Sequence, residues 1–156
     1  MCECKNEIKV KIKREDKRAI LPEYAHNGDA CMDLRVLVGE YGIGQIMPLL
    51  PKKSFIFDTG LKFDIPEGHV MKIFPRSGLG IKHKVVLSNL TAIIDENFKQ
   101  TVKISLTNNG DEVFYVNHND RVAQFQIVPY PKMIIEEVDE IEDTGRGEGI
   151  GSSGVK

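Results

Sequence analysis

The sequence has no tryptophan, only three cysteines among its 156 residues, and no long hydrophobic run. No apolar stretch approaches the roughly 20 residues that cross a bilayer, so we expect no membrane partner. The first 15 residues lack the apolar centre of a secretory signal, which favours a cytoplasmic location. An odd number of cysteines (Cys2, Cys4 and Cys31) argues against a closed disulfide framework, and we expect reduced thiols.

A large excess of charge of either sign is also absent, since 21 lysines and arginines face 23 acids and the net charge is −2. Bulk electrostatics therefore exclude general binding to nucleic acid or to a membrane surface. The P-loop pattern G-x-x-x-x-G-K-[ST] is missing from the sequence. "GIGSSG" (149–154) fits the dinucleotide pattern G-x-G-x-x-G, but it follows an acidic stretch instead of a strand, so we exclude a dinucleotide-binding fold.

Short runs in which apolar and polar residues alternate are spread along most of the chain, and this period of two predicts β-strands. The expected strands lie at 8–13, in three runs within 54–75, and at 101–110, 112–116 and 122–129. Turn sequences such as "DTG" and "PEG" separate the runs within 54–75. No stretch carries three or four turns of helical period. We therefore predict one all-β domain, a sandwich or barrel, with at most one short helix near 78–84.

The composition changes near the C-terminus. "EEVDEIED" (136–143) has six acids in eight positions, and "GRGEGIGSSG" (145–154) has five glycines in ten. A run of like charge is typical of a solvated segment. We expect a core of residues 1–135, an acidic linker at 136–144 and a flexible glycine-rich arm at 145–156.

The turn sequence "PRSGLG" (75–80) is a candidate phosphate site. Arg76, Ser77 and Gly78 would bring a guanidinium, a hydroxyl and free backbone N–H groups together, and these groups suit a phosphate. Gln124, inside an expected apolar strand, could donate to an anionic ligand. A surface turn with one arginine, and a glutamine bonded to its neighbours, explain the same residues without a ligand.

Two acids lie beside apolar residues. Asp95 follows Ile93 and Ile94, and an acid at the mouth of a pocket can hold a water as a general base or join a metal site. The alternative for Asp95 is a turn residue in a hairpin loop. Asp33 lies between two apolar residues, and an enclosed acid needs a partner, either an arginine or a bound cation. Asn89 offers both a donor and an acceptor, as recognition of a base edge requires.

The order of these segments is more specific than any one of them. "MDLR", "PRSGLG", "IIDENF", "DRVAQ" and "RGEGIGSSG" follow one another along the chain. In this order and spacing they resemble the five motifs of the trimeric dUTP pyrophosphatases (dUTPases), from about residue 25 to the C-terminus. The resemblance implies a jelly-roll-like β-barrel, a homotrimer with shared active sites, and hydrolysis of dUTP to dUMP and pyrophosphate with Mg²⁺ as cofactor.

The resemblance also implies roles for the residues around the base and the reacting phosphorus. Asp95 would orient and deprotonate the water that attacks the α-phosphorus of dUTP. A pocket walled by main chain would read uracil, and the flat ring of Phe98 would pack beneath the deoxyribose, where a 2′-hydroxyl would not fit. The residues implied for the nucleoside are Asn89, Ile93, Ile94, Phe98 and Lys103.

By the same resemblance, one chain would supply the base pocket, a second the phosphate contacts, and the tail of a third would close the site. The implied phosphate contacts are Arg76, Ser77, Gly78 and Gln124, and the implied tail residues are Arg146, Ile150, Gly151, Ser152 and Ser153. Asp33 would lie near Mg²⁺ and bind it through water. The cation would neutralise about four negative charges of the triphosphate.

This sequence departs from the family pattern at several positions. Phe98 stands where the family often has tyrosine, and Ala92 and Gln100 replace usual glycines. The largest departure is Ile150, at the position nearest to a phenylalanine that stacks on uracil. Isoleucine can cover the base but cannot stack on it. Stacking contributes roughly 1–3 kcal/mol in nucleic-acid systems, so we expect a weaker lid.

Two alternatives to dUTP hydrolysis remain open at this point. A dCTP deaminase, or a bifunctional relative, needs a further acid on the strand after the hairpin, where "VKISLTN" has Ser105 and no acid. The second alternative is a non-catalytic nucleotide-sensing module. Asp95, Arg76 and Arg146 are all present and argue against it, because a pure binder has no need of the water-activating acid. Pyrophosphate release from dUTP and dCTP separates the three functions.

Overall fold

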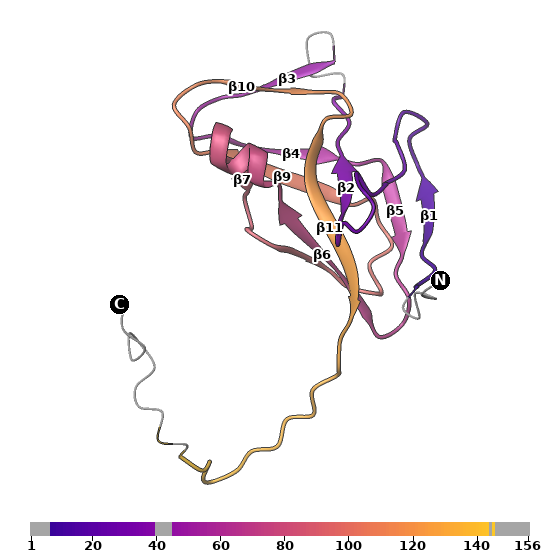
Figure 1. The fold of residues 1–156 in the computed structure, drawn as a ribbon, viewed down its shortest axis with the longest axis vertical. Helices are drawn as coiled ribbons and strands as arrows, with labels where there is room; N and C mark the ends of the chain where they lie inside the picture. The colour runs from indigo at the N-terminus through magenta and orange to yellow at the C-terminus, as the bar shows by residue number, and fades with distance from the viewer. Residues whose placement is uncertain (1–6, 40–44, 144, 146–156) are drawn as a thin grey trace.

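The structure is a computed structural model that describes residues 7–39, 45–143 and 145 (Figure 1). In this part of the chain eleven strands and one short π-type helix confirm the prediction of a nearly all-β protein. The elements are β1 (Lys11–Arg14), β2 (Met32–Arg35), β3 (Ile46–Leu49), β4 (Ser54–Asp58), β5 (Leu61–Asp64), β6 (His69–Pro75), η1 (Leu79–His83), β7 (Val85–Leu87), β8 (Ala92–Ile94), β9 (Lys103–Asn108), β10 (Phe114–Asn117) and β11 (Arg121–Pro129). None of the described residues belongs to a helix long and apolar enough to cross a membrane.

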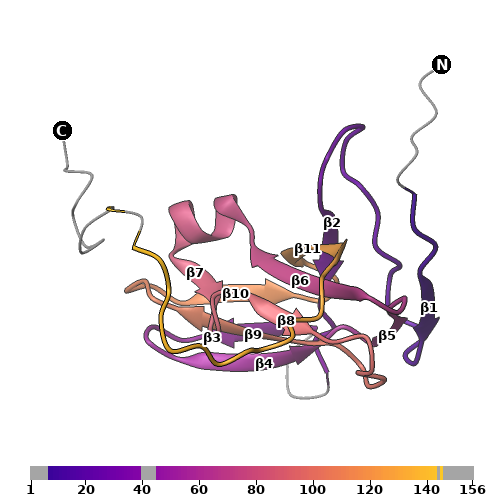
Figure 2. The same cartoon turned by 90° about the horizontal axis from the view of Figure 1, so that it is seen from below.

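The described strands form four antiparallel sheets. The two larger sheets have the orders β2–β11–β6–β8 and β4–β9–β7, and the pairs β1–β5 and β3–β10 form the two smaller ones. Figure 2 shows β4 and β9 in a layer below β2, β11 and β6. Buried side chains from both layers form one core, which includes Leu34, Phe57, Met71, Ile73, Ile104, Leu106 and Phe125.

Alternating burial accounts for the strands that the sequence predicts. On β9, Ile104 and Leu106 are buried, whereas Ser105 and Thr107 between and after them are partly exposed. A strand with this pattern buries one face against the other layer and leaves the second face polar. The first expected strand begins later than its pattern suggests, at Lys11 instead of residue 8. The helix expected near residues 78–84 is η1.

The sequence pattern does not predict the short strands β2, β3, β7 and β8. Each has only three or four residues, too few for a period of two to stand out. Pro48 also interrupts β3, and proline is tolerated there because, among the described residues, β3 pairs on one side alone, with β10, and can spare a backbone donor. These strands therefore depend on pairing with neighbours that are distant in the sequence.

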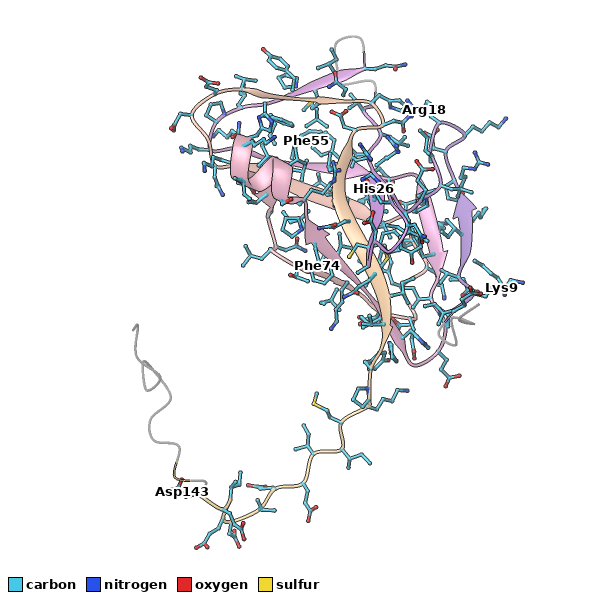
Figure 3. The ribbon with its side chains drawn as sticks, in the orientation of Figure 1. Lys9, Arg18, His26, Phe55, Phe74 and Asp143 are labelled. Atoms are coloured by element: carbon cyan, nitrogen blue, oxygen red, sulfur yellow. The ribbon has the colours of Figure 1, made fainter. Side chains whose placement is uncertain are left out.

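After β11 the chain leaves the domain as an extended segment (Figure 1). Residues 131–143 contain no strand or helix and are exposed throughout. Figure 3 shows their side chains projecting into solvent as far as Asp143. Met133, Ile134 and Ile135 are 87%, 96% and 90% exposed. A run of uncovered apolar side chains is typical of a surface that contacts another molecule.

Candidate active site

The candidate residues lie at opposite ends of one sheet, β2–β11–β6–β8. At one end, Gln124 of β11 pairs with Asp33 of β2, beside the last residues of β6. At the other end, Ile94 of β8 pairs with Met71 of β6, and Asp95 follows directly. Strand β6 therefore connects the two groups.

Two arginines enclose Asp33. The Nε atom of Arg76 lies 3.0 Å from Oδ1 of Asp33, and a guanidinium nitrogen of Arg121 lies 3.2 Å from Oδ2. Arg76 also donates to the backbone oxygen of Arg121 at 2.8 Å, so its guanidinium is held at two points. The Asp33 side chain is 11% exposed, and low exposure strengthens charge-assisted bonds of this kind. The arginine partner that an enclosed acid requires is thus present within the chain.

Ser77, Gly78 and Gln124 lie at the same end of the sheet. Ser77 and Gly78 begin the helical segment that continues as η1, and both are exposed. A Cβ atom added at Gly78 would meet nothing within 4 Å, so a ligand can approach this backbone closely. The side-chain nitrogen of Gln124 donates to the carbonyl of Pro75 at 3.0 Å, and its second hydrogen remains for another acceptor.

The residues at this end line a pocket of about 560 Å³, a volume within the usual range of ligand sites. Lys82, His83 and His26 also line the pocket, although the sequence pattern did not single them out as site residues. The signal that could have found two of them is the basic pair that follows "PRSGLG" within one short helix. Asp29 and Asp33 line the pocket too, but Asp33 is already paired with arginines, so Arg76 and Lys82 can still attract an anionic group.

Asp95 begins a tight turn directly after β8. The N–H of Phe98 donates to the carbonyl of Asp95 at 3.1 Å, and the side chain of Asp95 is exposed. Next to it, Oε2 of Glu96 accepts the N–H of Gly68 at 2.5 Å and ties this turn to the β5–β6 connection. Asp95 is therefore a turn residue whose carboxylate water and ligands can reach.

The residues expected to read the base surround β8. This strand pairs with β6, whereas β7 pairs with β9, so residues 87–95 cross from one of the two larger sheets to the other. As an edge strand in the described part of the chain, β8 leaves one row of backbone donors and acceptors open.

The side chains expected around the base leave much of their surface uncovered in one chain. Ile93 and Phe98 are 54% and 37% exposed. Asn89, in the turn between β7 and β8, and Lys103, the first residue of β9, are also exposed, and Ile94 is half-buried. Asn89, Ile93, Ile94 and Phe98 thus lie on or next to β8, whereas Lys103 belongs to the other larger sheet.

One chain keeps Asp95 and Arg76 far apart. Asp95 lies level with Val70 near the start of β6, whereas Arg76 follows the last residue of that strand. Six residues of extended chain at about 3.3 Å each correspond to about 20 Å. Side chains separated by this length of strand cannot both contact one phosphate group.

The described residues contain no group of three or more His, Cys, Asp or Glu side chains that could hold a metal ion. Each oxygen of Asp33 accepts from one arginine, and a carboxylate has about four acceptor sites. Asp33 can therefore also accept from water. This donor set fits a magnesium ion held mainly by phosphate oxygens and water, with Asp33 as a contact through water.

The tail residues named above lie outside the described part of the chain. They are Arg146, Ile150, Gly151, Ser152 and Ser153.

The chain is similar to known proteins over most of its length. A family model described as dUTPase matches residues 17–154. The deoxyuridine 5′-triphosphate nucleotidohydrolase of Alkaliphilus metalliredigens is 42% identical over 148 residues, which cover 94% of this chain and 98% of the relative. The protein of the same name from Clostridium kluyveri is 37% identical over 145 residues, which cover 92% of this chain and 96% of the relative.

Solved structures of phage dUTPases have the same fold. A variant of the Staphylococcus bacteriophage 80alpha dUTPase with dUpNHpp aligns with a TM-score of 0.79 at 24% identity, covering 94% of this chain and 99% of that chain. A mutant dUTPase from phage phi11 of S. aureus, solved with the coordination of a structural Mg(II) ion, has a TM-score of 0.73 at 23% identity. That alignment covers 87% of this chain and 100% of the phage chain.

Proposed function

The chain belongs to the dUTPase family, and from this premise we propose that it hydrolyses dUTP to dUMP and pyrophosphate at active sites shared within a homotrimer. It is a hydrolase, a dUTP diphosphatase. The observation that carries the shared site is the separation of Asp95 and Arg76 along β6. Two groups about 20 Å apart in one chain can meet one triphosphate only if they come from different chains.

Asp95 carries out the chemical step in this proposal. Its carboxylate takes a proton from a water, and the water oxygen forms a bond to the α-phosphorus of dUTP. The bond from that phosphorus to the oxygen that bridges to the β-phosphate breaks, and its electron pair leaves with pyrophosphate. The exposed position of Asp95 supports this role, because water and substrate can reach the carboxylate.

Arg76, Ser77, Gly78 and Gln124 bind the phosphates. Asp33 holds Arg76 before substrate arrives, so the positive charge of the guanidinium is positioned in advance. Ser77 and Gly78, exposed at the start of the helical segment, supply a hydroxyl and backbone donors. When bound, Mg²⁺ would neutralise phosphate charge, and Asp33 would hold it through water.

The open edge of β8 reads uracil in this proposal. Backbone groups around Ile93 and Ile94, with Asn89, present a fixed pattern of donors and acceptors that differs from the pattern cytosine requires. Phe98 lies beneath the deoxyribose, and Lys103 borders the base. The exposure of Phe98 in one chain supports this placement, because the ring is available to a ligand.

The proposal keeps the expected division into a core of residues 1–135, a linker at 136–144 and an arm at 145–156 that closes a site in the trimer, although residues 131–135 already run outside the sheets. The uncovered apolar run at 133–135 supports an extended path across another chain. Arg146, Ser152 and Ser153 would contact the β- and γ-phosphates, and Gly151 would let the backbone approach. Ile150 would cover the base. We expect this nucleotide reaction to take place in the cytoplasm.

The test measures pyrophosphate release by the purified chain with Mg²⁺ and either dUTP or dCTP. We expect release from dUTP only, and a trimer by light scattering coupled to size exclusion. Binding of dUTP without pyrophosphate release would indicate a nucleotide sensor. Release of ammonia from dCTP would indicate a deaminase, and either result would contradict the proposal.

A further inference from the structure

Glu96, the residue after Asp95, makes a long-range contact that the reaction scheme above does not use. Its Oε2 atom accepts the backbone N–H of Gly68 at 2.5 Å, across 28 residues of sequence. The Glu96 side chain is partly buried, whereas Asp95 is exposed. A charged acceptor bound to a backbone donor away from bulk water is one of the stronger hydrogen bonds in a protein.

Gly68 is a rigid partner for this bond. It lies in the turn between β5 and β6, where the N–H of His69 donates to the carbonyl of Pro66 at 3.1 Å. Its φ of +72° is a conformation that side chains of L-residues disfavour, so glycine maintains the turn. The carbonyl of Gly68 accepts the N–H of Tyr130 at 2.9 Å, directly after β11. Gly68 thus joins the turn that carries Asp95 to the start of the C-terminal segment.

A second contact holds the far side of the same turn. Lys99 donates to Oδ1 of Asp64 at 2.7 Å, and Asp64 is the last residue of β5. The turn is therefore attached to the β5–β6 connection through Glu96 and again through Lys99. Asp95 lies next to the Glu96 attachment, and as an exposed side chain it is not held by core packing.

The Tyr130 side chain lies beside Glu96 at this junction. Burial raises the pKa of the Tyr130 phenol, and the negative charge of Glu96 raises that pKa further. The carboxylate of Glu96 therefore lies close enough to the first residue after β11 to interact with it electrostatically.

We propose that Glu96 is a positioning residue, which acts through Asp95 by fixing the turn at residues 95–98, here called the catalytic turn, to Gly68. The inference rests on the proposed function, because it assigns Glu96 a part in the step that Asp95 carries out. A displacement of about 1 Å in a reacting group can lower a rate by about 100-fold. Removal of the Glu96 acceptor should therefore affect kcat more than binding.

The experiment compares steady-state dUTP hydrolysis by the full chain and three variants. Glu96→Ala should lower kcat by about 10-fold, with KM within about twofold, because the turn loosens while the phosphate contacts persist. Glu96→Gln should keep at least about half of the wild-type kcat, since its amide oxygen can accept the same N–H. The matched control is Glu67→Ala, which removes an exposed carboxylate from the β5–β6 turn and should leave kcat unchanged.

Melting curves and a further variant keep the test decisive if Glu96→Ala does not fold. Glu96→Asp keeps the charge but shortens the side chain by one methylene, so it should also lower kcat severalfold while melting close to wild type. Normal kcat in both Glu96→Ala and Glu96→Asp would overturn the inference, as would an equal loss in Glu96→Gln. Neither result would affect the proposed function, which fails separately if the wild-type chain releases no pyrophosphate.

Discussion

The two ends of the β2–β11–β6–β8 sheet are built in different ways. At one end, Asp33 is nearly enclosed and bonds to Arg76 and Arg121, so side chains of three elements hold one another. At the other end, Asp95 is exposed, and a backbone turn and the contact of Glu96 with Gly68 hold its segment. Charge pairing thus fixes the proposed phosphate-binding end within one chain, whereas the proposed catalytic residue is left exposed.

Loss of the Asp95 carboxylate tests the catalytic end most directly. Asp95→Asn should lower kcat by about 10²–10⁴-fold, because the amide cannot accept the proton of the attacking water. Affinity for dUTP, measured by calorimetry, should change little. The control is Asp111→Asn, the same change at an exposed residue that pairs with Lys52. Wild-type turnover in Asp95→Asn would remove Asp95 from its role.

Loss of Arg76 tests the phosphate-binding end and the separation of the two ends. Arg76→Ala should lower kcat/KM by about 10²–10³-fold, as removal of one preorganised donor does. When Arg76→Ala and Asp95→Asn chains exchange subunits, about a quarter of the sites should combine an intact Asp95 with an intact Arg76. Activity that stays at the level of the separate variants would show that one chain supplies both groups.

Removal of the arm tests whether the open end needs a cover. Deletion of residues 144–156 should lower kcat/KM by about 10–10²-fold, because a closing segment helps to orient the triphosphate. The trimer and its melting temperature should persist, since the core lies before the deletion. Normal turnover of dUTP by the truncated protein would show that the arm is not a lid.

The smallest effect concerns the second attachment of the catalytic turn. Asp64→Asn should lower kcat by less than about threefold, because exposed ion pairs contribute little. The hydrogen bond from Lys99 holds the pKa of Asp64 below its ordinary value of 3.8. This contribution to stability is therefore present above pH 3.8 and is lost as the pH falls through the lower pKa of the folded state. The melting temperatures of the wild-type chain and Asp64→Asn should therefore become equal below that pKa. A constant difference at all pH values would contradict the assignment.

Much of the fold can be read from the sequence because alternation reports burial. The pattern of Ile104 and Leu106 on β9 is visible in the sequence, and the structure buries both residues. The sequence pattern does not predict the short strands β2, β3, β7 and β8, because three or four residues are too few to show a period of two. Their strand conformation comes from pairing with distant partners.

The candidate site also has features that the sequence predicts and features that only the tertiary structure shows. The order of the motifs suffices to identify the family, because the chemistry of each segment depends on residue type and spacing, which are properties of the chain itself. Only the tertiary structure decides that two arginines meet Asp33, that Glu96 reaches Gly68, and that β6 separates the two ends. These contacts join residues far apart in the sequence, and the pairing of strands that are distant along the chain brings them together.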